Sequence, residues 1–234
     1  MAASSSYTRN QMDILRRYTA CDISDALLKL KVPGAGFVSD LNMYAPSDAV
    51  TVAPASTVLF APKGSSPKSR PPSYPEPNIP AASHWADLTQ PGTIVVIRQP
   101  DGHRNAVCGG IMALRISQCH AKGIVVWGRA RDISELKSTG LPIWASGLST
   151  VGAGASCTPW AVQVPITVDG DLLVEPGDLV FSDPINGVVV IPRAKVAQAI
   201  DILPKLTTAD ERVRDDVLGG TTVREAFKKH RGNL

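Results

Sequence analysis

A glycine pair and an arginine–aspartate pair are the residues in this sequence whose types and spacing best suit chemistry. Gly109-Gly110 precede an apolar stretch at helical spacing, and Arg131-Asp132 follow a short apolar run. A planar guanidinium binds a carboxylate or an oxyanion through two hydrogen bonds, and a neighbouring carboxylate can hold a hard divalent cation. Backbone amides at the start of a helix can bind an anion. These groups together suit a small 2-oxo acid bound beside a metal ion, although an exposed ion pair next to a loop glycine is the ordinary structural alternative.

The elements around these residues form one continuous unit. Residues 111–116 carry apolar side chains at helical spacing, and Gly123 is expected to mark the end of that helix. Residues 124–127 predict a short strand covered on both faces. Ligands of open α/β folds lie at the carboxyl ends of strands, so residues 128–132 are expected beside a pocket. Glu135 falls in the first turn of the next helix, where a carboxylate serves either a metal ion or the helix dipole.

The remaining pattern predicts an α/β fold. We expect helices over residues 8–18 and 25–30, the second capped by Asp22 or Ser24, and a short one at 84–88. Strands are expected at residues 51–53, 57–60, 93–98, 142–145, 162–168, 179–181 and 188–191. From residue 194 the pattern turns helical, and two further helices are predicted at 210–218 and 223–230. A β-rich body with a helical end is therefore predicted.

Two segments interrupt this pattern. Residues 63–82 contain six prolines among serines and charges, which excludes a helix or a central strand and predicts an extended surface loop. This loop is either a mobile lid near a pocket or a solvated excursion. Residues 147–154 are rich in Gly, Ser and Thr, and form a turn, line the pocket or contact another subunit. No lysine follows them at the spacing of a nucleotide-binding loop.

Composition excludes several classes of protein. The net charge is +3 over 234 residues, and no basic run with interleaved aromatics argues for nucleic acid. No apolar run approaches the roughly 20 residues that span a bilayer. Residues 1–6 lack the pattern of a secretory signal. The four cysteines are scattered without metal-binding spacing, so we expect reduced thiols and a cytoplasmic protein.

Gly110, twenty intervening residues, Arg131-Asp132, two more and Glu135 resemble the G-x20-R-D-x2-E/D signature of the RraA-like superfamily. The resemblance runs from about Cys21 to Arg193 and is most like the fungal and yeast members. Residues 21–27, 90–96, 174–178 and 183–192 add to it in the right order. The superfamily includes the class II 4-hydroxy-4-methyl-2-oxoglutarate / 4-carboxy-4-hydroxy-2-oxoadipate aldolases, which also decarboxylate oxaloacetate.

This resemblance implies an architecture. The expected fold is an α/β, RraA-like layered αββα arrangement with a central mixed sheet or β-barrel and flanking helices. Residues 1–193 would form the catalytic domain, with 63–82 as a proline-rich surface insertion. Residues 194–234 would form a carboxy-terminal helical tail. A homotrimer or homohexamer is implied, because relatives place their pockets between subunits.

The resemblance also assigns roles to residues. Arg131 would bind the carboxylate and keto-oxygen side of a 2-oxo acid, and Asp132 would anchor Mg²⁺ or Mn²⁺ partly through waters. Glu135 is a second candidate metal ligand. Substrate binding would fall to backbone at Gly109, Gly110, Ile111 and Met112. Many bacterial members have an acidic residue where this chain has Ile111, so any carboxylate contribution to water or metal is absent at that position.

Three functions follow as hypotheses. The first is a divalent-metal-dependent lyase that cleaves a carbon–carbon bond of small 2-oxo acids through a pyruvate enolate. No lysine stands in a Schiff-base motif, so a metal route to the enolate is more economical than a covalent one. The second is a non-catalytic, protein-binding regulator like the members that restrain RNase E. Those members lack the intact Arg-Asp pair, so its presence favours catalysis. The third is a lyase repurposed for a larger metabolite, with the proline loop reshaping the mouth of the pocket.

Overall fold

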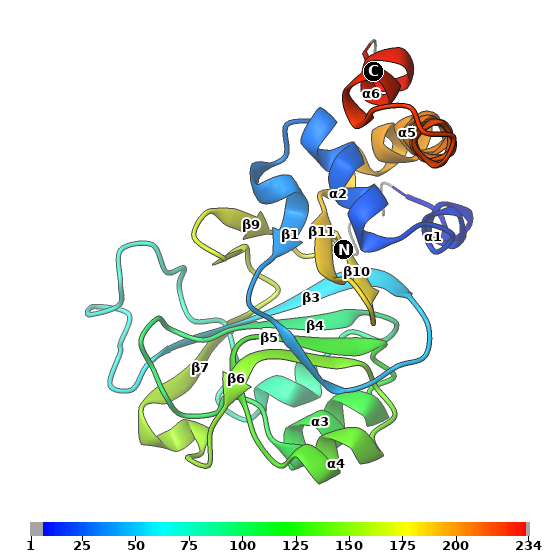
Figure 1. Ribbon diagram of the computed structural model, residues 1–234. Coiled ribbons are helices and arrows are strands. Elements are labelled where there is room, and N and C mark those ends of the chain that lie inside the picture. Colours follow the sequence, from blue (N-terminus) through cyan, green and yellow to red (C-terminus); the bar gives the residue numbers. More distant parts are fainter. Residues whose placement is uncertain (1–6, 233–234) are drawn as a thin grey trace.

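A large mixed sheet forms the centre of the molecule in the computed structural model, which describes residues 7–232 (Figure 1). The expectation for residues 1–6 lies outside this part of the chain. The strands are β1 (Phe37–Val38), β2 (Asn42–Ala45), β3 (Thr51–Pro62), β4 (Ile94–Arg98), β5 (Gly123–Ala130), β6 (Ile143–Leu148), β7 (Cys157–Val162), β10 (Leu179–Asp183) and β11 (Gly187–Ile191). Their order is β1-β11-β10-β3-β4-β5-β6-β2, with β7 also paired to β3, while β8 (Ile166–Val168) and β9 (Leu172–Val174) form a separate hairpin.

Strand β3 joins the two halves of the sheet. Residues 51–54 pair antiparallel with β10, residues 55–59 pair parallel with β4, and residues 58–62 pair antiparallel with β7. The two short strands predicted here are therefore one strand of 12 residues. Pro54 has no N–H to donate, and it lies where β3 changes partner from β10 to β4.

Strands β3, β4, β5 and β6 are parallel neighbours, so their carboxyl ends lie at one edge of the sheet. Lys63 follows the end of β3, Arg98 ends β4, and Arg131 follows the end of β5. The topology thus brings basic residues from three separate parts of the sequence to the same edge. This is the edge at which ligands of open α/β sheets bind.

Helices pack on the sheet in two groups. Helices α3 (Gly110–Gln118) and α4 (Ile133–Ser138), with the short η2 (Trp85–Leu88), cover the β4–β6 part of the sheet. Helices α1 (Arg9–Leu15), α2 (Ala20–Lys29), α5 (Val196–Leu218) and α6 (Val223–Arg231) gather at the β10–β11 end. Short 3-10 turns are η1 (Pro33–Gly36), η3 (Ala153–Ala155) and η4 (Arg193–Lys195). The predicted α/β class, with a large mixed sheet and flanking helices, is confirmed.

The start of α2 differs from the prediction. The helix begins at Ala20 and is capped by Thr19, not by Asp22 or Ser24. The Thr19 hydroxyl accepts a hydrogen bond from the Asp22 N–H at 3.2 Å, and the Asp22 carboxylate accepts one from the Thr19 N–H at 2.8 Å. Asp22 is therefore the third helical residue of a reciprocal capping box.

Two other predicted boundaries were wrong because single residues adopt left-handed backbone conformations. Helix α3 ends at Gln118 and His120 turns the chain with a φ of 61°, so Gly123 is the first residue of β5. The strand predicted over residues 162–168 is broken after Val162, where Gln163 has a φ of 54°. Hydrophobic spacing continues across both turns, which is why the pattern did not show them.

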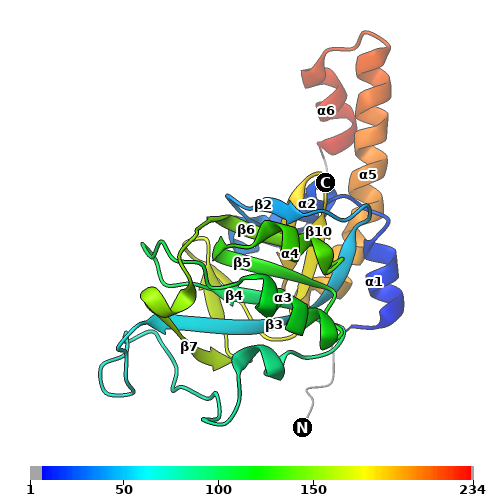
Figure 2. The ribbon, with the colours of Figure 1, turned by 90° about the horizontal axis from the view of Figure 1, so that it is seen from below.

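The carboxy-terminal helices form a projecting arm (Figure 2). Two predicted helices are one 23-residue helix, α5, with Pro204 inside it. Its first half packs against α2, and Arg231 on α6 donates to Asp25 of α2 at 3.1 Å and to Asp210 of α5. None of the helices within residues 7–232 is both long and apolar enough to cross a membrane.

Replacing Gly36 by alanine is expected to lower the free energy of unfolding by about 2–5 kcal/mol. Gly36 has a φ of +72°, and a Cβ there would lie 2.6 Å from Leu27 Cδ1 and against the Val190 carbonyl oxygen. Gly34, with a φ of +56° and no heavy atom within 4 Å of its Cβ position, is the matched control. Gly34→Ala should lower the same quantity by only about 1–2 kcal/mol. Equal losses for the two variants in urea unfolding would contradict the packing argument.

Candidate active site

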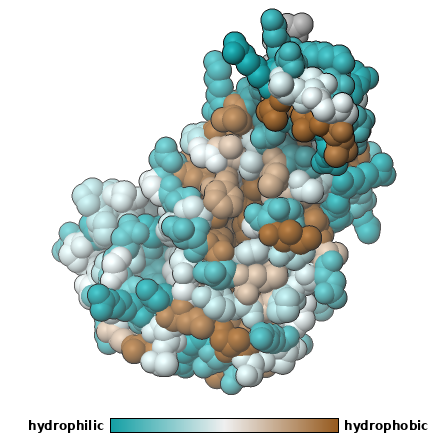
Figure 3. All heavy atoms as spheres, viewed as in Figure 1, coloured by the Kyte–Doolittle hydropathy of each residue, from teal (hydrophilic) through white to brown (hydrophobic). Residues whose placement is uncertain are grey.

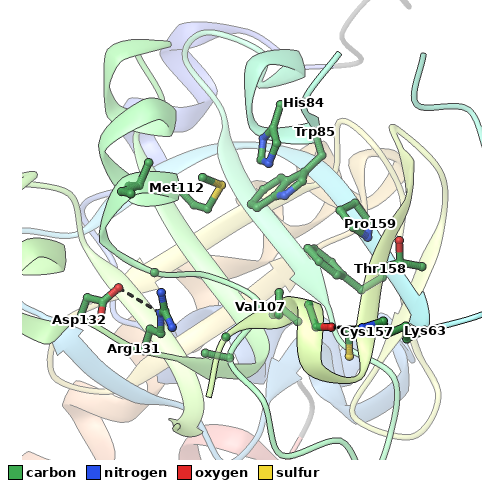
Figure 4. Close-up of a pocket in the computed structure, with 17 residues that line it drawn as sticks. Lys63, His84, Trp85, Val107, Met112, Arg131, Asp132, Cys157, Thr158 and Pro159 are labelled. Atoms are coloured by element: carbon green, nitrogen blue, oxygen red, sulfur yellow. Dashed lines mark hydrogen bonds and ion pairs between the residues drawn. The ribbon is translucent and has the colours of Figure 1, made fainter. Parts of the chain in front are cut away.

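A cavity of about 530 Å³ opens at the carboxyl edge of the parallel strands (Figure 4). Arg131 and Asp132 lie at one end of the cavity and Lys63 and Thr158 at another, with apolar side chains between them. The residues that line the cavity are Phe60, Lys63, His84, Trp85, Ala106, Val107, Gly109, Ile111, Met112, Arg131, Asp132, Gly152, Ala153, Gly154, Cys157, Thr158 and Pro159. The structure therefore gathers Arg131, Asp132, Gly109, Ile111 and Met112, all named from the sequence, around one space.

Arg131 and Asp132 face the start of helix α3. The Asp132 carboxylate accepts a hydrogen bond from the Gly110 N–H at 3.2 Å, and the same oxygen lies 3.2 Å from Arg131 Nε. Asp132 has a left-handed backbone, with φ 63° and ψ 51°, which is uncommon outside glycine. Asp132 begins α4, but its side chain does not cap that helix. Its carboxylate is directed across the cavity edge to the amino end of α3 instead.

The first turn of α3 offers backbone donors to the cavity. Gly109 precedes the helix without a side-chain cap, and the Gly110 N–H is already bonded to Asp132. Ile111 and Met112 are the next residues, and the N–H groups of a first helical turn have no carbonyl acceptor within the helix. Since both residues line the cavity, their amides and the positive end of the helix dipole can bind a carboxylate there.

Glu135 lies behind this helix start and is not among the residues that line the cavity. A Cβ on Gly110 would lie 2.5 Å from Glu135 Cβ and would overlap its carboxylate. A Cβ on Gly109 would lie 2.7 Å from Asp132 Oδ2. Because neither glycine has a Cβ, the Asp132 and Glu135 carboxylates can approach the backbone at the start of α3. This close approach accounts for both glycines.

Sequence reasoning missed Lys63, His84 and Trp85. Lys63 donates a 2.6 Å hydrogen bond to the Gly154 carbonyl, and its exposed ammonium faces the cavity. His84 caps η2 by accepting a hydrogen bond from the Ala86 N–H at 3.2 Å. The order of the parallel strands, β3-β4-β5, puts Lys63 and Arg131 at one edge of the sheet, and this order was the signal that could have indicated Lys63.

The two segments that interrupt the sequence pattern both reach the cavity. Residues 63–82 have no helix or strand, as predicted, and lead from Lys63 toward His84. This segment is fixed to β7, because Asn78 exchanges two 2.8 Å hydrogen bonds with Val162 and Trp160 Nε1 donates to the Pro75 carbonyl at 2.8 Å. A lid function for it stays a prediction. From the second segment, Gly152 and Gly154 line the cavity.

Cys108 lies next to the glycine pair but is not suited to act as a nucleophile. Burial, assisted by the nearby Asp132 carboxylate, raises the pKa of its thiol to about 12. A thiol with that pKa stays protonated at neutral pH. All four cysteines are free, as expected from their spacing.

The oxygen donors at the cavity edge fit a hard divalent cation that keeps much of its hydration. Within residues 7–232, no group of three or more His, Cys, Asp or Glu side chains is placed to hold a metal. Mg²⁺ is typically bound by only one or two carboxylates together with waters and substrate oxygens. Asp132 provides one such carboxylate at the cavity, and Glu135 lies against Gly110 but does not line the cavity. This donor set suits Mg²⁺ or Mn²⁺ and does not suit a fully ligated structural ion.

Comparisons with known proteins agree with the fold described above. A family model described as RraA-like, Aldolase/RraA, matches residues 20–190. A solved structure of a Pseudomonas syringae pv. tomato protein is 24% identical, with a TM-score of 0.73 over 94% of this chain and 97% of that one. The structure of Streptomyces coelicolor RraAS2, titled as an unusual member of the RNase ES inhibitor RraA protein family, is 25% identical. Its TM-score is 0.70, over 89% of this chain and 97% of that chain.

Two curated relatives match shorter stretches. A Halalkalibacterium halodurans protein named "Putative 4-hydroxy-4-methyl-2-oxoglutarate aldolase" is 30% identical over 121 residues, 52% of this chain and 56% of that protein. Protein DlpA of Legionella pneumophila is 24% identical over 145 residues, which are 62% of this chain and 23% of DlpA. The match therefore spans less than two thirds of the length of either relative.

Proposed function

Because the chain belongs to the RraA-like family, we propose that its cavity is the active site of a divalent-metal-dependent lyase acting on small 2-oxo acids. The reaction would be aldol cleavage of a 4-hydroxy-2-oxo acid such as 4-hydroxy-4-methyl-2-oxoglutarate, decarboxylation of oxaloacetate, or both. The observation that carries this proposal is the convergence of Arg131, Asp132 and the start of α3 on one cavity.

Substrate binding would use the two positively charged features of the cavity, which are the amino end of α3 and the Arg131 guanidinium. The pyruvyl carboxylate would accept hydrogen bonds from the amides of Ile111 and Met112, at the positive end of the α3 dipole. Arg131 would donate to the 2-keto oxygen. Its guanidinium lies beside Asp132, which limits its orientations before substrate arrives.

Both reactions break the bond between C3 and C4 of the substrate. The electron pair of that bond moves into an enolate on C2 and C3, and Arg131 stabilises the negative charge on its oxygen. A divalent cation, held by Asp132 and candidate Glu135, would supply Lewis-acid stabilisation of the same charge when bound. In aldol cleavage the 4-hydroxyl proton passes to a water in the cavity, and a proton from water then converts the enolate to pyruvate.

The lining and the volume of the cavity also bear on the third hypothesis, in which the substrate is larger than a simple oxo acid. Phe60, Trp85 and Pro159 form an apolar wall, and Lys63 lies across the cavity from Asp132. Pyruvate alone would fill only a small part of the 530 Å³. We therefore propose a substrate whose C4 substituent extends along this wall, which is consistent with a lyase adapted to a larger metabolite.

Pyruvate release from oxaloacetate and from 4-hydroxy-4-methyl-2-oxoglutarate should require Mg²⁺ or Mn²⁺ and should stop on addition of EDTA. Asp132→Asn should raise the Mg²⁺ concentration needed for half-maximal rate by about tenfold or more, because the carboxylate charge is lost. Excess Mg²⁺ added after EDTA should restore the wild-type rate. Turnover of both substrates that persists in EDTA would contradict a metal-dependent reaction.

A protein-binding regulator is the second candidate, and the similarity to Streptomyces coelicolor RraAS2 supports it. A well-folded protein that releases no pyruvate from either substrate with Mg²⁺ or Mn²⁺ would favour this candidate. It would then be tested by inhibition of a purified RNase E-type ribonuclease.

We also propose that the chain forms a homotrimer or homohexamer. Exposed apolar side chains that a neighbouring subunit could cover occur on α3 and near the end of β6: Ile111 (73% exposed), Leu114 (54%), Leu148 (42%) and Val151 (49%). Light scattering should give a mass three or six times that of the chain, and Ile111→Lys should lower it. A monomeric wild-type protein at micromolar concentration would contradict this assembly.

A further inference from the structure

A second cavity, of about 390 Å³, lies beside the active-site cavity and shares no lining residue with it. It is formed by the turn that follows β4, by residues 127–129 near the end of β5, and by Ser146 of β6. Buried Gln99 and Asn105 lie at its inner side, with Cys157 of the active-site cavity close beyond them. The carboxyl edge of the sheet therefore carries two separate cavities.

The charges around this second cavity are mostly positive. Three arginines line it, Arg98, Arg104 and Arg129, together with His103 and one carboxylate, Asp101. The charge of Arg98 is compensated, because its guanidinium donates a hydrogen bond to the Asp101 carboxylate at 2.8 Å and another to the Thr167 carbonyl at 2.7 Å. Its side chain is only 15% exposed, compared with 85% for Asp101.

The other two guanidinium groups have no carboxylate partner within residues 7–232. Arg129 donates to the Leu148 carbonyl at 2.9 Å, a neutral acceptor that leaves its charge uncompensated. Arg104 is exposed and forms no ion pair with a described residue. Two positive charges therefore line this concave space. Each guanidinium carries five donor N–H groups, and one of those on Arg129 is already bonded to Leu148.

The backbone that presents Arg129 is held by a buried side chain. Gln99 is 2% exposed, its Oε1 accepts from the Arg129 N–H at 2.8 Å, and its Nε2 donates to the Asn105 carbonyl at 2.6 Å. The pairing of β5 with β6 shifts register between Val126 and Arg129 at this point. Only glycine fits at position 128, since a Cβ there would lie 2.5 Å from Gln99 Cβ. Such bulges commonly redirect side chains beside binding sites.

We propose that this second cavity is a binding site for a small polyanion that carries phosphate or several carboxylate groups. Guanidinium groups match both kinds of anion through paired hydrogen bonds. The half-buried Trp127 adds an apolar wall, so an organic anion fits the space better than a single inorganic ion. The site is distinct from the active-site cavity, because the two cavities share no lining residue and meet only where Gln99 and His103 contact Cys157.

Isothermal titration of the full chain at low ionic strength tests this site, with pyrophosphate and citrate as separate probes for the two kinds of anion. At least one probe should bind with one site per chain. Arg104→Gln should weaken that binding about tenfold, and so should Arg129→Gln. Raising the salt concentration should weaken it further, because a partly exposed site is screened. Binding of pyrophosphate alone would identify the ligand as a phosphate compound, and binding of citrate alone as a polycarboxylate.

Arg17→Gln is the matched control, since Arg17 is exposed, lies between α1 and α2 and lines neither cavity, so its replacement should leave the binding constant unchanged. Arg104 forms no ion pair or side-chain hydrogen bond with any residue between 7 and 232, so its replacement should leave the thermal midpoint of unfolding unchanged as well. No binding of either probe at millimolar concentration would overturn the proposal. So would binding that Arg104→Gln and Arg17→Gln weaken equally, because net charge and not this cavity would then explain it.

Discussion

Arg131→Lys should lower kcat for pyruvate release by about 100-fold or more at saturating Mg²⁺. The substitution keeps the positive charge but replaces a planar fork of donors by a single ammonium, which cannot bond the keto oxygen and a carboxylate in the same geometry. The Arg131 side chain is 43% exposed and its ion pair with Asp132 is 3.2 Å long, so the free energy of unfolding should change by no more than about 1 kcal/mol. Loss of activity without loss of stability is therefore the expected result.

Whether Arg131→Lys changes kcat or KM distinguishes stabilisation of the enolate by Arg131 from a role in substrate binding alone. If the guanidinium stabilises the enolate, kcat and kcat/KM should fall together, whereas a role in substrate binding alone would raise KM. Arg115→Lys is the control, because Arg115 lies on α3 and pairs with Asp87 outside the cavity. Wild-type kcat in Arg131→Lys would remove this residue from the proposed mechanism.

Sequence reasoning placed Gly109, Arg131 and Asp132 beside one pocket, and all three line one cavity, whereas Glu135 does not line it. The glycine pair, Arg131 and Asp132 lie in one continuous stretch of helix, strand and turn, so local patterns were enough to place them near one another. Position 132 also needed a left-handed backbone to direct its carboxylate toward Gly110. No pattern of hydrophobic residues reports such a conformation, so the contact itself could not be predicted.

Residues that reach the cavities through long-range pairing were harder to predict. Lys63 and Arg131 come to the same edge of the sheet only because β3 pairs with β4 and β4 with β5. Similarly, the second cavity depends on Gln99 entering the bulge of β5, a contact between side chain and backbone that has no sequence signature. Helix boundaries failed for a related reason, since Thr19 acts through a side-chain cap and His120 through its backbone conformation, and hydrophobic periodicity reports neither.

Gly110→Ala should lower both stability and turnover, although it only adds a methyl group to a residue in the first turn of a helix. The new Cβ would lie 2.5 Å from Glu135 Cβ and overlap its carboxylate, so α3 and α4 would have to separate. Overpacking of this kind costs about 1–3 kcal/mol of unfolding free energy. Since Asp132 begins α4 and bonds the Gly110 N–H, the separation should also displace the carboxylate, with a loss of about 100-fold in turnover.

A double variant separates this steric effect from other consequences of the substitution. Glu135→Gly removes all three atoms that a Cβ on Gly110 would meet, and its own cost should be about 1 kcal/mol of helix propensity. Gly110→Ala should therefore be much less destabilising in the Glu135→Gly background than in the wild type, as measured by urea unfolding. Gly154→Ala, with no atom within 4 Å of its Cβ position, should leave the unfolding free energy unchanged. Additive losses in the double variant would show that Glu135 and Gly110 are not in contact. If Glu135 also ligates the metal, Glu135→Gln should weaken Mg²⁺ activation while the stability stays that of the wild type.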